Sequence, residues 1–305
     1  MDALRLTVAV PTRDRRDAVL GALEAVVPQL EGGDELIVVD NASTDETEAA
    51  VRTWLATNRP AGRLLSEPRG GVSAARNRAL REASTPVICF VDDDVRPAPG
   101  WLAALRRSWS QARPQTAVIG GPMKAEWMSA RPAWLTDHLL YVVAVFDLGA
   151  EPRNLDQRAG SGFVWGGNLS VRTDATLGAG GFDEQRGVRP EAPFDRGEEE
   201  DLQRRLAAAG FEVRYEPEAL VHHLVPPERL TESFFLRCFR ERGRLDAARG
   251  RSRREGALAL ARAVPRGIVL ELARHPRGPG ARFASAHAVA LLTGPRSPQQ
   301  PRNAL

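Results

Sequence analysis

Apolar runs and amphipathic stretches alternate along the first 120 residues. Four of the runs have the length and composition of buried strands: 4–10, 36–39, 63–66 and 87–91. Three stretches between them are predicted helices: 18–30, 45–57 and 72–82. Pro11 is expected to end the first strand, and Asp17 to cap the helix after it. This alternation predicts an α/β fold with a doubly wound, mostly parallel sheet.

The pattern becomes less regular after Trp101. Three further helices and two further strands are predicted, over 100–112, 201–209 and 229–250 and over 117–120 and 211–215, respectively. Residues 121–160 are irregular, and 256–292 are rich in Ala and Leu but broken by prolines. We therefore expect a domain over 1–225, an Arg-rich helical extension over 226–292 and a disordered tail over 293–305.

Charge is distributed unevenly along the 305 residues, whose net charge is +3. Residues 226–305 hold 16 Arg and 6 acidic residues, which leaves the rest of the chain net acidic. A basic segment of this kind suits peripheral contact with anionic lipid at the inner face of the membrane. The alternative is composition bias, because every basic residue except Lys124 is an arginine. Cosedimentation with anionic vesicles that survived deletion of 226–305 would exclude the lipid interpretation.

The two cysteines, Cys89 and Cys238, are not in a metal-type spacing, which is typical of a reduced, cytoplasmic protein. The N-terminal apolar run is too short for a signal peptide, and no run of 18 uncharged apolar residues predicts a spanning helix. Nucleic acid is not an expected partner, because the basic residues are diffuse and are not interleaved with aromatic ones.

The strongest chemical signal is the triplet Asp92-Asp93-Asp94, directly after the predicted strand 87–91. Three carboxylates at the end of a buried strand cannot be buried unpaired, so we expect them at an opening of the sheet. Clustered acidic oxygens suit Mg²⁺ or Mn²⁺, and such an ion suits a nucleoside diphosphate. The alternative is an exposed acidic loop without a metal.

Seven segments together resemble the inverting GT-A glycosyltransferases of family 2. In chain order they are 8–15 (VAVPTRDR), 38–47 (VVDNASTDET), 71–80 (GVSAARNRAL), 90–94 (FVDDD), 165–172 (WGGNLSVR), 180–184 (GGFDE) and 197–206 (GEEEDLQRRL). Each is weak alone, but their order and spacing are specific. The resemblance implies a GT-A fold whose residues 1–120 bind the nucleotide and whose residues 121–225 hold the acceptor and the catalytic group.

The resemblance also implies roles for individual residues on the nucleotide side. Pro11, Thr12 and Arg13 would close on the nucleoside, and Arg76 would lie near the nucleotide or diphosphate. Asp92 would contact the ribose and Asp94 would bind the metal, and Asp93, between them, is also assigned to the nucleotide-sugar site. Asp40 is assigned to the donor base, and a carboxylate there can accept an imide N–H of a pyrimidine or an amide N–H of guanine. The alternatives are an Asx turn or helix cap for Asp40 and a solvated side chain for Arg76.

The catalytic base is expected in the run Glu198-Glu199-Glu200-Asp201, where the family usually has Glu-Asp-x-Asp. Glu199 takes the position where the family usually has the Asp base. Because the extra methylene of Glu moves the carboxylate, Glu198 is the alternative base. Asp201 would cap the following helix or pair with Arg205 at i, i+4. An acidic helix N-terminus without a catalytic role is the competing interpretation.

Other residues are expected to complete the site. Imidazole is a ligand for Mn²⁺, and the spacing favours His223 over His222 as a metal ligand. Trp165, Gly166, Gly167 and Asn168 would form a floor below the donor sugar and the acceptor; a glycine bend with a core Trp is the alternative. The loop 185–197 would close over the donor. Trp127 and Trp134 would contribute to acceptor specificity, or pack as a surface hairpin.

The predicted function is therefore metal-dependent inverting transfer of a sugar from a UDP-, dTDP- or GDP-linked donor to an acceptor hydroxyl. The acceptor would be a glycan, a lipid-linked sugar or a small molecule. A single addition is favoured over processive synthesis because no spanning helix is predicted. Two alternatives are a non-catalytic nucleotide-sugar-binding scaffold and a nucleotidyltransferase, although the latter usually has glycines where this chain has Pro-Thr-Arg-Asp-Arg.

Overall fold

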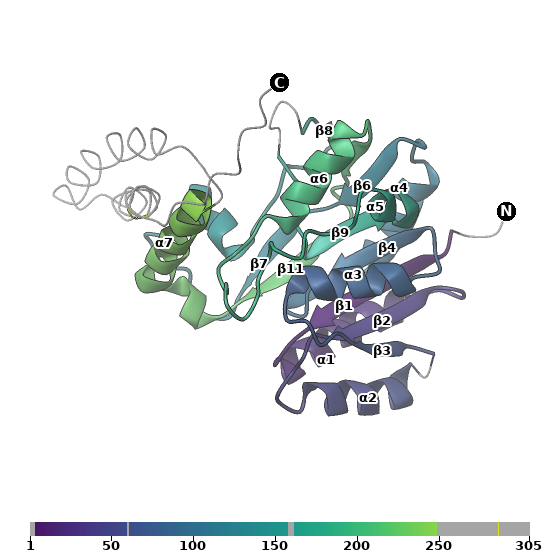
Figure 1. The fold of residues 1–305 in the computed structure, drawn as a ribbon, viewed down its shortest axis with the longest axis horizontal. Helices are drawn as coiled ribbons and strands as arrows, with labels where there is room; N and C mark the ends of the chain where they lie inside the picture. The colour runs from purple at the N-terminus through teal and green to yellow at the C-terminus, as the bar shows by residue number, and fades with distance from the viewer. Residues whose placement is uncertain (1–3, 60, 158–161, 249–285, 287–305) are drawn as a thin grey trace, which may run out of the picture. The chain divides into compact units, whose positions relative to one another are not determined.

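The computed structural model describes residues 4–59, 61–157, 162–248 and 286. Within them, eight strands form one mixed sheet, in the order β3-β2-β1-β4-β9-β6-β10-β8 (Figure 1). In chain order these are β1 (Leu6–Thr12), β2 (Glu35–Asp40), β3 (Arg63–Ser66), β4 (Val87–Val91), β6 (Thr116–Gly120), β8 (Arg153–Leu155), β9 (Asn168–Arg172) and β10 (Glu212–Tyr215). A second sheet, in the order β5-β11-β7, contains β5 (Val95–Pro97), β7 (Met123–Trp127) and β11 (Val221–Val225).

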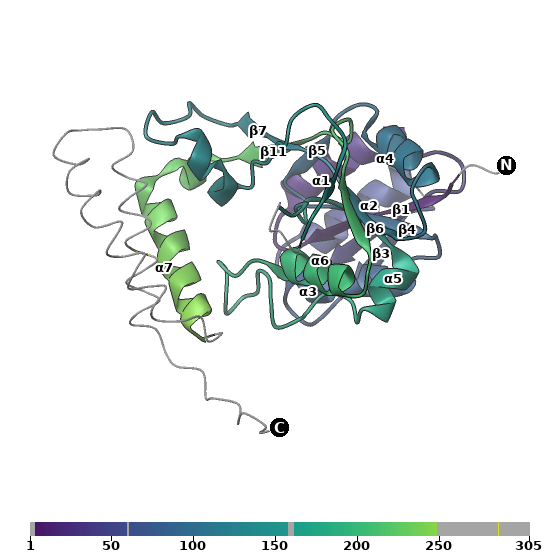
Figure 2. The same ribbon diagram turned by 90° about the horizontal axis from the view of Figure 1, so that it is seen from above.

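Helices cover both faces of the large sheet. The α-helices are α1 (Arg16–Val26), α2 (Thr47–Asn58), α3 (Val72–Glu82), α4 (Trp101–Ser110), α5 (Thr173–Gly178), α6 (Glu198–Ala208) and α7 (Glu232–Ala248). Short 3₁₀ helices are η1 (Val27–Gln29), η2 (Asp137–Val143) and η3 (Pro227–Leu230). Figure 2 shows α1 and α4 on one side of the sheet and α3 and α6 on the other. The prediction of a doubly wound, mostly parallel α/β fold is confirmed.

The strands are buried on both faces, as their continuous apolar runs predict. In β4, Val87, Cys89 and Val91 face a core shared with α1 and α4. Ile88 and Phe90 face a second core shared with α3 and α6. The ring of Phe90 meets that of Phe182 edge to face in this second core, at 5.5 Å between centroids. The sheet is therefore a rigid platform between two cores.

The chain divides into two compact units. Residues 1–126 and 144–224 form the first, which contains the large sheet and the predicted site. The second groups 127–143 with residues from Val225 onward, and its described part contains η2, η3 and α7. Within the second unit, the ring of Trp134 meets that of Phe235 edge to face at 5.0 Å. The segment with Trp134 thus groups with the chain after 225, a connection that the sequence did not indicate.

Several predicted boundaries shift in the structure. Pro11 does not end the first strand; β1 continues to Thr12, because beyond Ala9 it pairs only with β2 and the missing N–H of proline faces an unpaired side. The helix α6 begins at Glu198, so Asp201 lies in its first turn and does not cap it. Asp201 instead pairs with Arg205 at 2.8 Å, as the i, i+4 spacing predicts.

Two parts of the sequence prediction concern the C-terminal region. The predicted helix over 229–250 is observed as η3 and α7. The rest of the predicted extension and the predicted tail lie outside the described residues, apart from residue 286. Among the helices that the structure describes, none has the length and apolar character needed to cross a membrane.

Asn168, the first residue of β9, is 1% exposed and belongs to the core. Its Oδ1 accepts the indole N–H of Trp101 at 2.9 Å, and its Nδ2 donates to the carbonyls of Pro122 and Ala219 at 3.1 and 2.7 Å. Both the oxygen and the nitrogen of its side-chain amide therefore form hydrogen bonds within the protein. The structure places Asn168 below the floor of the site, where it holds β9, α4 and the segment before β11 together.

Asn168→Ala is expected to lower the free energy of unfolding by about 2–4 kcal/mol, because the buried indole N–H of Trp101 and the carbonyl of Ala219 lose the hydrogen bonds that Asn168 makes to them. The carbonyl of Pro122 keeps its bond from the backbone N–H of Val221. Urea denaturation monitored by circular dichroism would measure the change. Asn58→Ala is the matched control, since the exposed Asn58 makes one bond to the carbonyl of Trp54. Equal losses of stability in the two variants would contradict the structural role of Asn168.

Candidate active site

The carboxyl ends of β1, β2 and β4 meet at one edge of the sheet. The register pairs Thr12 with Asp40 across β1 and β2, and Ala9 with Phe90 across β1 and β4. Asp92 follows β4 directly, and the antiparallel partner of Val91 is Asn168, so the Trp-Gly-Gly turn before β9 arrives at the same edge. The sheet thus brings together motifs that are up to about 150 residues apart in sequence.

Asp40 is the last residue of β2, and in the described part of the chain only one of its two carboxylate oxygens accepts a hydrogen bond. The residue is 3% exposed, and its Oδ2 accepts the backbone N–H of Ser43 at 3.2 Å. Its buried Oδ1 has no hydrogen-bond partner among the described residues. The first contact is the Asx turn considered from the sequence, while the second oxygen stays available. A buried acceptor without a partner is costly, and a ligand N–H would remove that cost.

The side chain of Asp93 is used inside the protein. Its Oδ1 accepts from the Arg15 guanidinium at 2.8 Å, and its Oδ2 accepts from the Thr12 hydroxyl at 2.9 Å. Burial raises the pKa of Asp93 to about 6, although the charge of Arg15 opposes the shift. These contacts fix the loop after β1 against the aspartate triplet, so Asp93 positions the loop rather than facing the opening.

Arg15 is a residue of the site that sequence reasoning missed. One of its guanidinium nitrogens, Nη1, bridges Asp93 at 2.8 Å and Asp94 at 2.9 Å. The two carboxylates hold the pKa of Arg15 above its usual value. A signal was present in the sequence, because adjacent carboxylates at a buried strand end need a nearby cation, and the loop after β1 supplies several arginines.

Asp94 and His223 form the pair best suited to a metal. Asp94 Oδ1 lies 3.5 Å from His223 Nε2, and His223 is buried in β11. Over the residues that the structure describes, no three His, Cys, Asp or Glu side chains are arranged to hold a metal ion. A carboxylate and an imidazole nevertheless fit Mn²⁺, and Mg²⁺ commonly uses one or two carboxylates with substrate phosphates. The donor set fits an ion that is completed by a diphosphate.

His222 does not join this pair. Because side chains alternate along a strand, His222 lies on the opposite face of β11 from His223. In the register it stands beside Arg96 of β5, whereas His223 stands beside Val95. The strand that contains the two histidines, β11, was not predicted from the sequence, and the alternation along it separates their side chains.

Arg76 of α3 is 2% exposed and joins two of the motifs. Its Nη1 donates to Glu198 Oε1 at 2.7 Å, and its Nη2 donates to Asp92 Oδ1 at 2.9 Å. Asp92 keeps 35% of its side chain exposed, so it can still face a ligand. Arg76 is thus enclosed by protein, in contrast to the solvated side chain considered as an alternative.

The acidic run begins α6 after Gly197, which has a φ of 98° that favours glycine. Glu198 is buried and holds Arg76, whereas Glu199 Oε2 is buried without a partner among the described residues. Burial, with the charge of Glu198 beside it, raises the pKa of Glu199 to about 8. A carboxylate with a pKa near neutrality suits a general base, so the geometry favours Glu199 over Glu198.

The Trp-Gly-Gly turn packs tightly against these side chains. A Cβ on Gly166 would lie 2.5 Å from Arg76 Nη2, and one on Gly167 would lie 3.0 Å from Asp92 Oδ2. Neither position has room for a side chain, which accounts for the glycine pair. Trp165 is partly buried, and the centroid of its ring lies 6.2 Å from that of Phe146. The turn therefore lies directly against Arg76 and Asp92. Its role as a floor below the donor sugar and the acceptor stays a prediction.

The remaining nucleotide-side residues occupy different environments. Pro11 is buried within β1, and Thr12 is committed to Asp93. Arg13 stays partly exposed, with Nε 3.3 Å from Asp14, and a Cβ on Gly70 would lie 2.8 Å from its Nη1. Of these three residues, Arg13 has the side chain that is best placed to meet a ligand.

The predicted closing loop is anchored on α3. The backbone N–H of Val72 donates to the Val188 carbonyl at 3.0 Å, and the Ser73 hydroxyl donates to the Arg186 carbonyl at 2.8 Å. Arg189 and the buried Asp195 add an ion pair at 3.2 Å within the loop. These contacts place the loop beside the N-terminus of α3. Closure over a donor stays a prediction.

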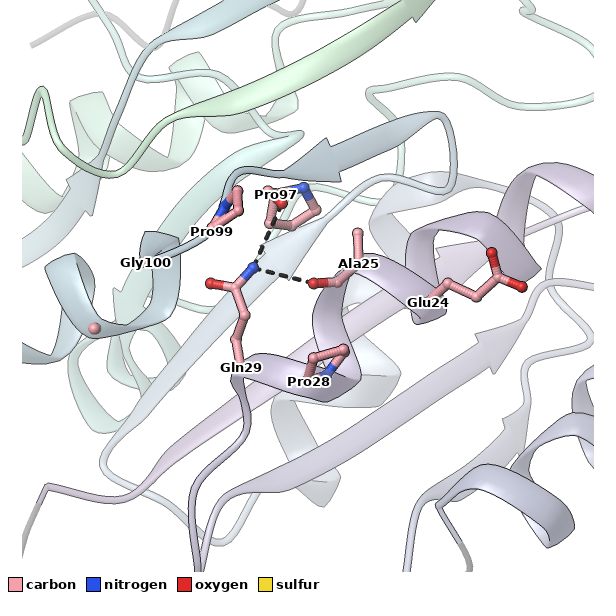
Figure 3. A pocket seen from close by; sticks show the side chains of 8 residues that line it. Glu24, Ala25, Pro28, Gln29, Pro97, Pro99 and Gly100 are labelled. Atoms are coloured by element: carbon pink, nitrogen blue, oxygen red, sulfur yellow. Dashed lines mark hydrogen bonds between the residues drawn. The ribbon is translucent and has the colours of Figure 1, made fainter.

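A separate pocket of about 550 Å³ lies among α1, η1, β5 and the start of α4 (Figure 3). Pro28, Pro97 and Pro99 contribute to its lining, together with Glu24 and Gln29. The Gln29 amide donates to the carbonyls of Ala25 and Pro97, so its polar end is already used. With one carboxylate and no cation in its lining, this pocket does not suit a diphosphate.

The fold and the arrangement of these side chains are typical of glycosyltransferases that use nucleotide sugars. The profile of Glycosyl transferase family 2 matches residues 7–176, which is more than half of the chain. The protein therefore belongs to this family, and the resemblance seen in the sequence is confirmed. The acidic run at 198–201 lies beyond the matched segment.

Two relatives are similar over most of the chain. The glucosyl-dolichyl phosphate glucuronosyltransferase of Haloferax volcanii is 22% identical over 222 residues, which cover 72% of this chain and 69% of the relative. The pre-mycofactocin glycosyltransferase of Mycobacterium tuberculosis is 28% identical over 218 residues, which cover 72% of this chain and 42% of the relative. The chain thus spans less than half of the mycobacterial protein.

Solved structures agree on the fold. The mannosyltransferase PcManGT of Pyrobaculum calidifontis, solved with GDP-Man and Mn²⁺, gives a TM-score of 0.56 at 21% identity, over 94% of this chain and 69% of that one. GalNAc-T7, solved with UDP, GalNAc and Mn²⁺, gives 0.59 at 13% identity, over 81% and 51%. At these identities the likeness establishes a GT-A fold and nothing about ligands.

Proposed function

We propose that the protein is a metal-dependent, inverting glycosyltransferase that adds one sugar from a nucleoside-diphosphate sugar to an acceptor hydroxyl. One observation carries the proposal: Arg76 joins Asp92 of the aspartate triplet to Glu198 of the acidic run, 122 residues away in sequence. The aspartate triplet and the acidic run that contains the candidate base Glu199 therefore belong to one site. An exposed acidic loop or an isolated helix N-terminus would not need this contact.

The side chains divide the reaction between them. The unpartnered Oδ1 of Asp40 would accept an N–H of the donor base, and Asp92 would contact the ribose. Asp94 and His223 would hold Mg²⁺ or Mn²⁺, an ion that neutralises charge on the departing diphosphate. Glu199 would take the proton of the acceptor hydroxyl while the new C–O bond forms and the bond to the diphosphate breaks. Attack opposite the leaving group inverts the anomeric carbon.

The nature of the acceptor is less constrained. One relative is named for glucosyl-dolichyl phosphate and the other for pre-mycofactocin, so a lipid-linked sugar and a small molecule both stay in the proposal. The half-buried Trp165 beside Phe146 offers an aromatic surface against which a sugar ring can pack. Addition of one sugar is proposed because no described helix would hold a growing polymer in a membrane.

Calorimetric titration with UDP, dTDP and GDP, each with and without Mn²⁺, tests the donor side. One nucleotide is expected to bind tightly and only with Mn²⁺. Asp40→Asn is expected to weaken that binding about 10- to 100-fold, because an amide in place of the carboxylate loses a charged hydrogen bond. Asp45→Asn is the control, since Asp45 is exposed and accepts the backbone N–H of Thr47.

The titration has clear contrary outcomes. Folded protein that bound none of the three nucleotides would overturn the transferase proposal in favour of a non-catalytic protein of the same fold. Equal affinities in Asp40→Asn and Asp45→Asn would remove Asp40 from the base site.

A further inference from the structure

Arg76 contacts more of the site than any role as a donor ligand requires. Besides Asp92 and Glu198, its guanidinium packs over the ring of Phe182, with Cζ 5.6 Å from the ring centroid. The backbone at Gly166 approaches the same guanidinium so closely that a Cβ would lie 2.5 Å away. One buried side chain thus contacts the aspartate triplet, the Trp-Gly-Gly turn, the Gly-Gly-Phe-Asp turn and the acidic run.

The charges around Arg76 do not balance. Burial alone would lower the pKa of Arg76, but the carboxylates of Asp92, Glu198 and Glu199 face its guanidinium and together raise it. Asp92 is partly exposed, so water stabilises its charge, but Glu198 and the Oε2 of Glu199 are buried. Two buried carboxylates that share one cation cannot ionise equally easily. Glu198 holds the direct contact with Arg76 at 2.7 Å, whereas the buried Oε2 of Glu199 has no hydrogen-bond partner among the described residues.

We propose that Arg76 and Glu198 are positioning residues: their buried ion pair sets the location and the charge of Glu199 and links it, through Asp92, to the donor site. This inference rests on the proposed function, in which Glu199 is the base. It also separates the two glutamates that the sequence left as alternatives. Glu198 serves as the fixed counter-ion, and Glu199 receives the acceptor proton.

The two partners should affect Glu199 in opposite directions. The charged groups that face Glu199 are Glu198 from its own helix and Arg76 from α3. Glu198→Gln removes the negative neighbour and leaves Arg76 to Glu199, so the pKa of Glu199 should fall by about one to three pH units. Arg76→Met removes the cation, so that pKa should rise. A role in packing alone would not produce shifts of opposite sign.

The titration can be followed without any substrate, by NMR of protein labelled with ¹³C at the glutamate side-chain carboxyl carbon. The signal of Glu199 is identified by its loss in Glu199→Gln, and its midpoint in the unmodified protein is expected at about 8. The matched controls are Arg78→Met on α3, which removes one ion pair of Glu82, and Glu200→Gln on α6, which removes the ion pair with Arg204. Neither control should move the midpoint.

A midpoint that moved in the same direction in Glu198→Gln and Arg76→Met, or in neither, would overturn the inference. Circular dichroism checks folding; if Arg76→Met does not fold, Glu198→Gln decides, with Arg76→Lys as the second variant because it keeps the charge and loses the forked contact. The proposed function fails separately: transfer activity retained by Glu199→Gln would overturn the base assignment while the NMR shifts still stood.

Discussion

Glu199→Gln is expected to lower kcat about 10²- to 10⁴-fold, the usual contribution of a general base. The substitution keeps the size and hydrogen-bonding shape of the side chain but removes its ability to accept the proton of the acceptor hydroxyl. Donor affinity should change little, because Glu199 does not contact the aspartate triplet directly and the link runs through Arg76 and Glu198. Steady-state kinetics and calorimetry on the same protein would separate these two effects.

The pH dependence gives a second measure of the same residue. Burial raises the pKa of Glu199 to about 8, and the base must be deprotonated to act, so kcat/KM should rise with pH until about 8. The sign follows from the chemistry, since below its pKa the carboxyl already carries a proton. A kcat/KM that was flat between pH 6 and 9, with chemistry rate-limiting, would contradict this role.

Glu200→Gln is the matched control for Glu199→Gln. Glu200 follows in the same helical turn but turns outward, where it forms an i, i+4 pair with Arg204. Surface pairs of this kind contribute little to stability, so kcat and unfolding should both stay close to those of the unmodified protein. A comparable loss of kcat in both variants would point to disturbance of α6 and against a specific base.

The sequence predicted the sheet edge well, for a physical reason. Continuous apolar runs identify buried strands, and the carboxyl ends of parallel strands meet at one edge. Asp40 and the aspartate triplet therefore came together as expected. The residues at this edge can be predicted from local sequence, because the first polar residue after each strand lies within a few positions of the strand itself.

What the sequence could not show depends on contacts between distant segments. Arg76 was expected to lie near the donor nucleotide or diphosphate, which stays a prediction, but its contacts with both Asp92 and Glu198 were not foreseen. Arg15 was not considered, although it holds two carboxylates of the triplet. In a chain this rich in arginine, nothing local distinguishes a buried guanidinium from a solvated one. For Arg76, only the packing of α3 and α6 against the sheet shows that its side chain is buried.

Short strands were the other source of error. No strand was predicted for the segment with His222 and His223, which is β11 and pairs with the three-residue β5. A strand this short has too few residues to show a clear alternation. Its pairing nevertheless decides which histidine reaches Asp94, because neighbouring side chains point to opposite faces.

Asp94→Asn is expected to abolish the Mn²⁺ dependence of nucleotide binding and to lower kcat/KM at least about 10²-fold, since a bound metal contributes several kcal/mol of charge stabilisation. The amide keeps the size of the side chain and removes the negative charge that the ion needs. Nucleotide titrations with and without Mn²⁺, together with electron paramagnetic resonance of bound Mn²⁺, measure the effect independently of the acceptor. Asp17→Asn is the control, because Asp17 is exposed on α1 and pairs with Arg16.

Asp93→Asn is a second control for the metal assignment, because substitutions of the two adjacent carboxylates Asp93 and Asp94 are expected to change different properties. Asp93 is buried and bonded to Arg15 and Thr12, so its loss should lower stability, while Mn²⁺ binding with the nucleotide persists. Asp94 shares Arg15 with it but also faces His223 at 3.5 Å, so its loss should act on the metal first. If Asp94→Asn bound Mn²⁺ and nucleotide normally, the metal would have to be assigned to Asp92, the most exposed carboxylate of the three, and His223 would lose its proposed role.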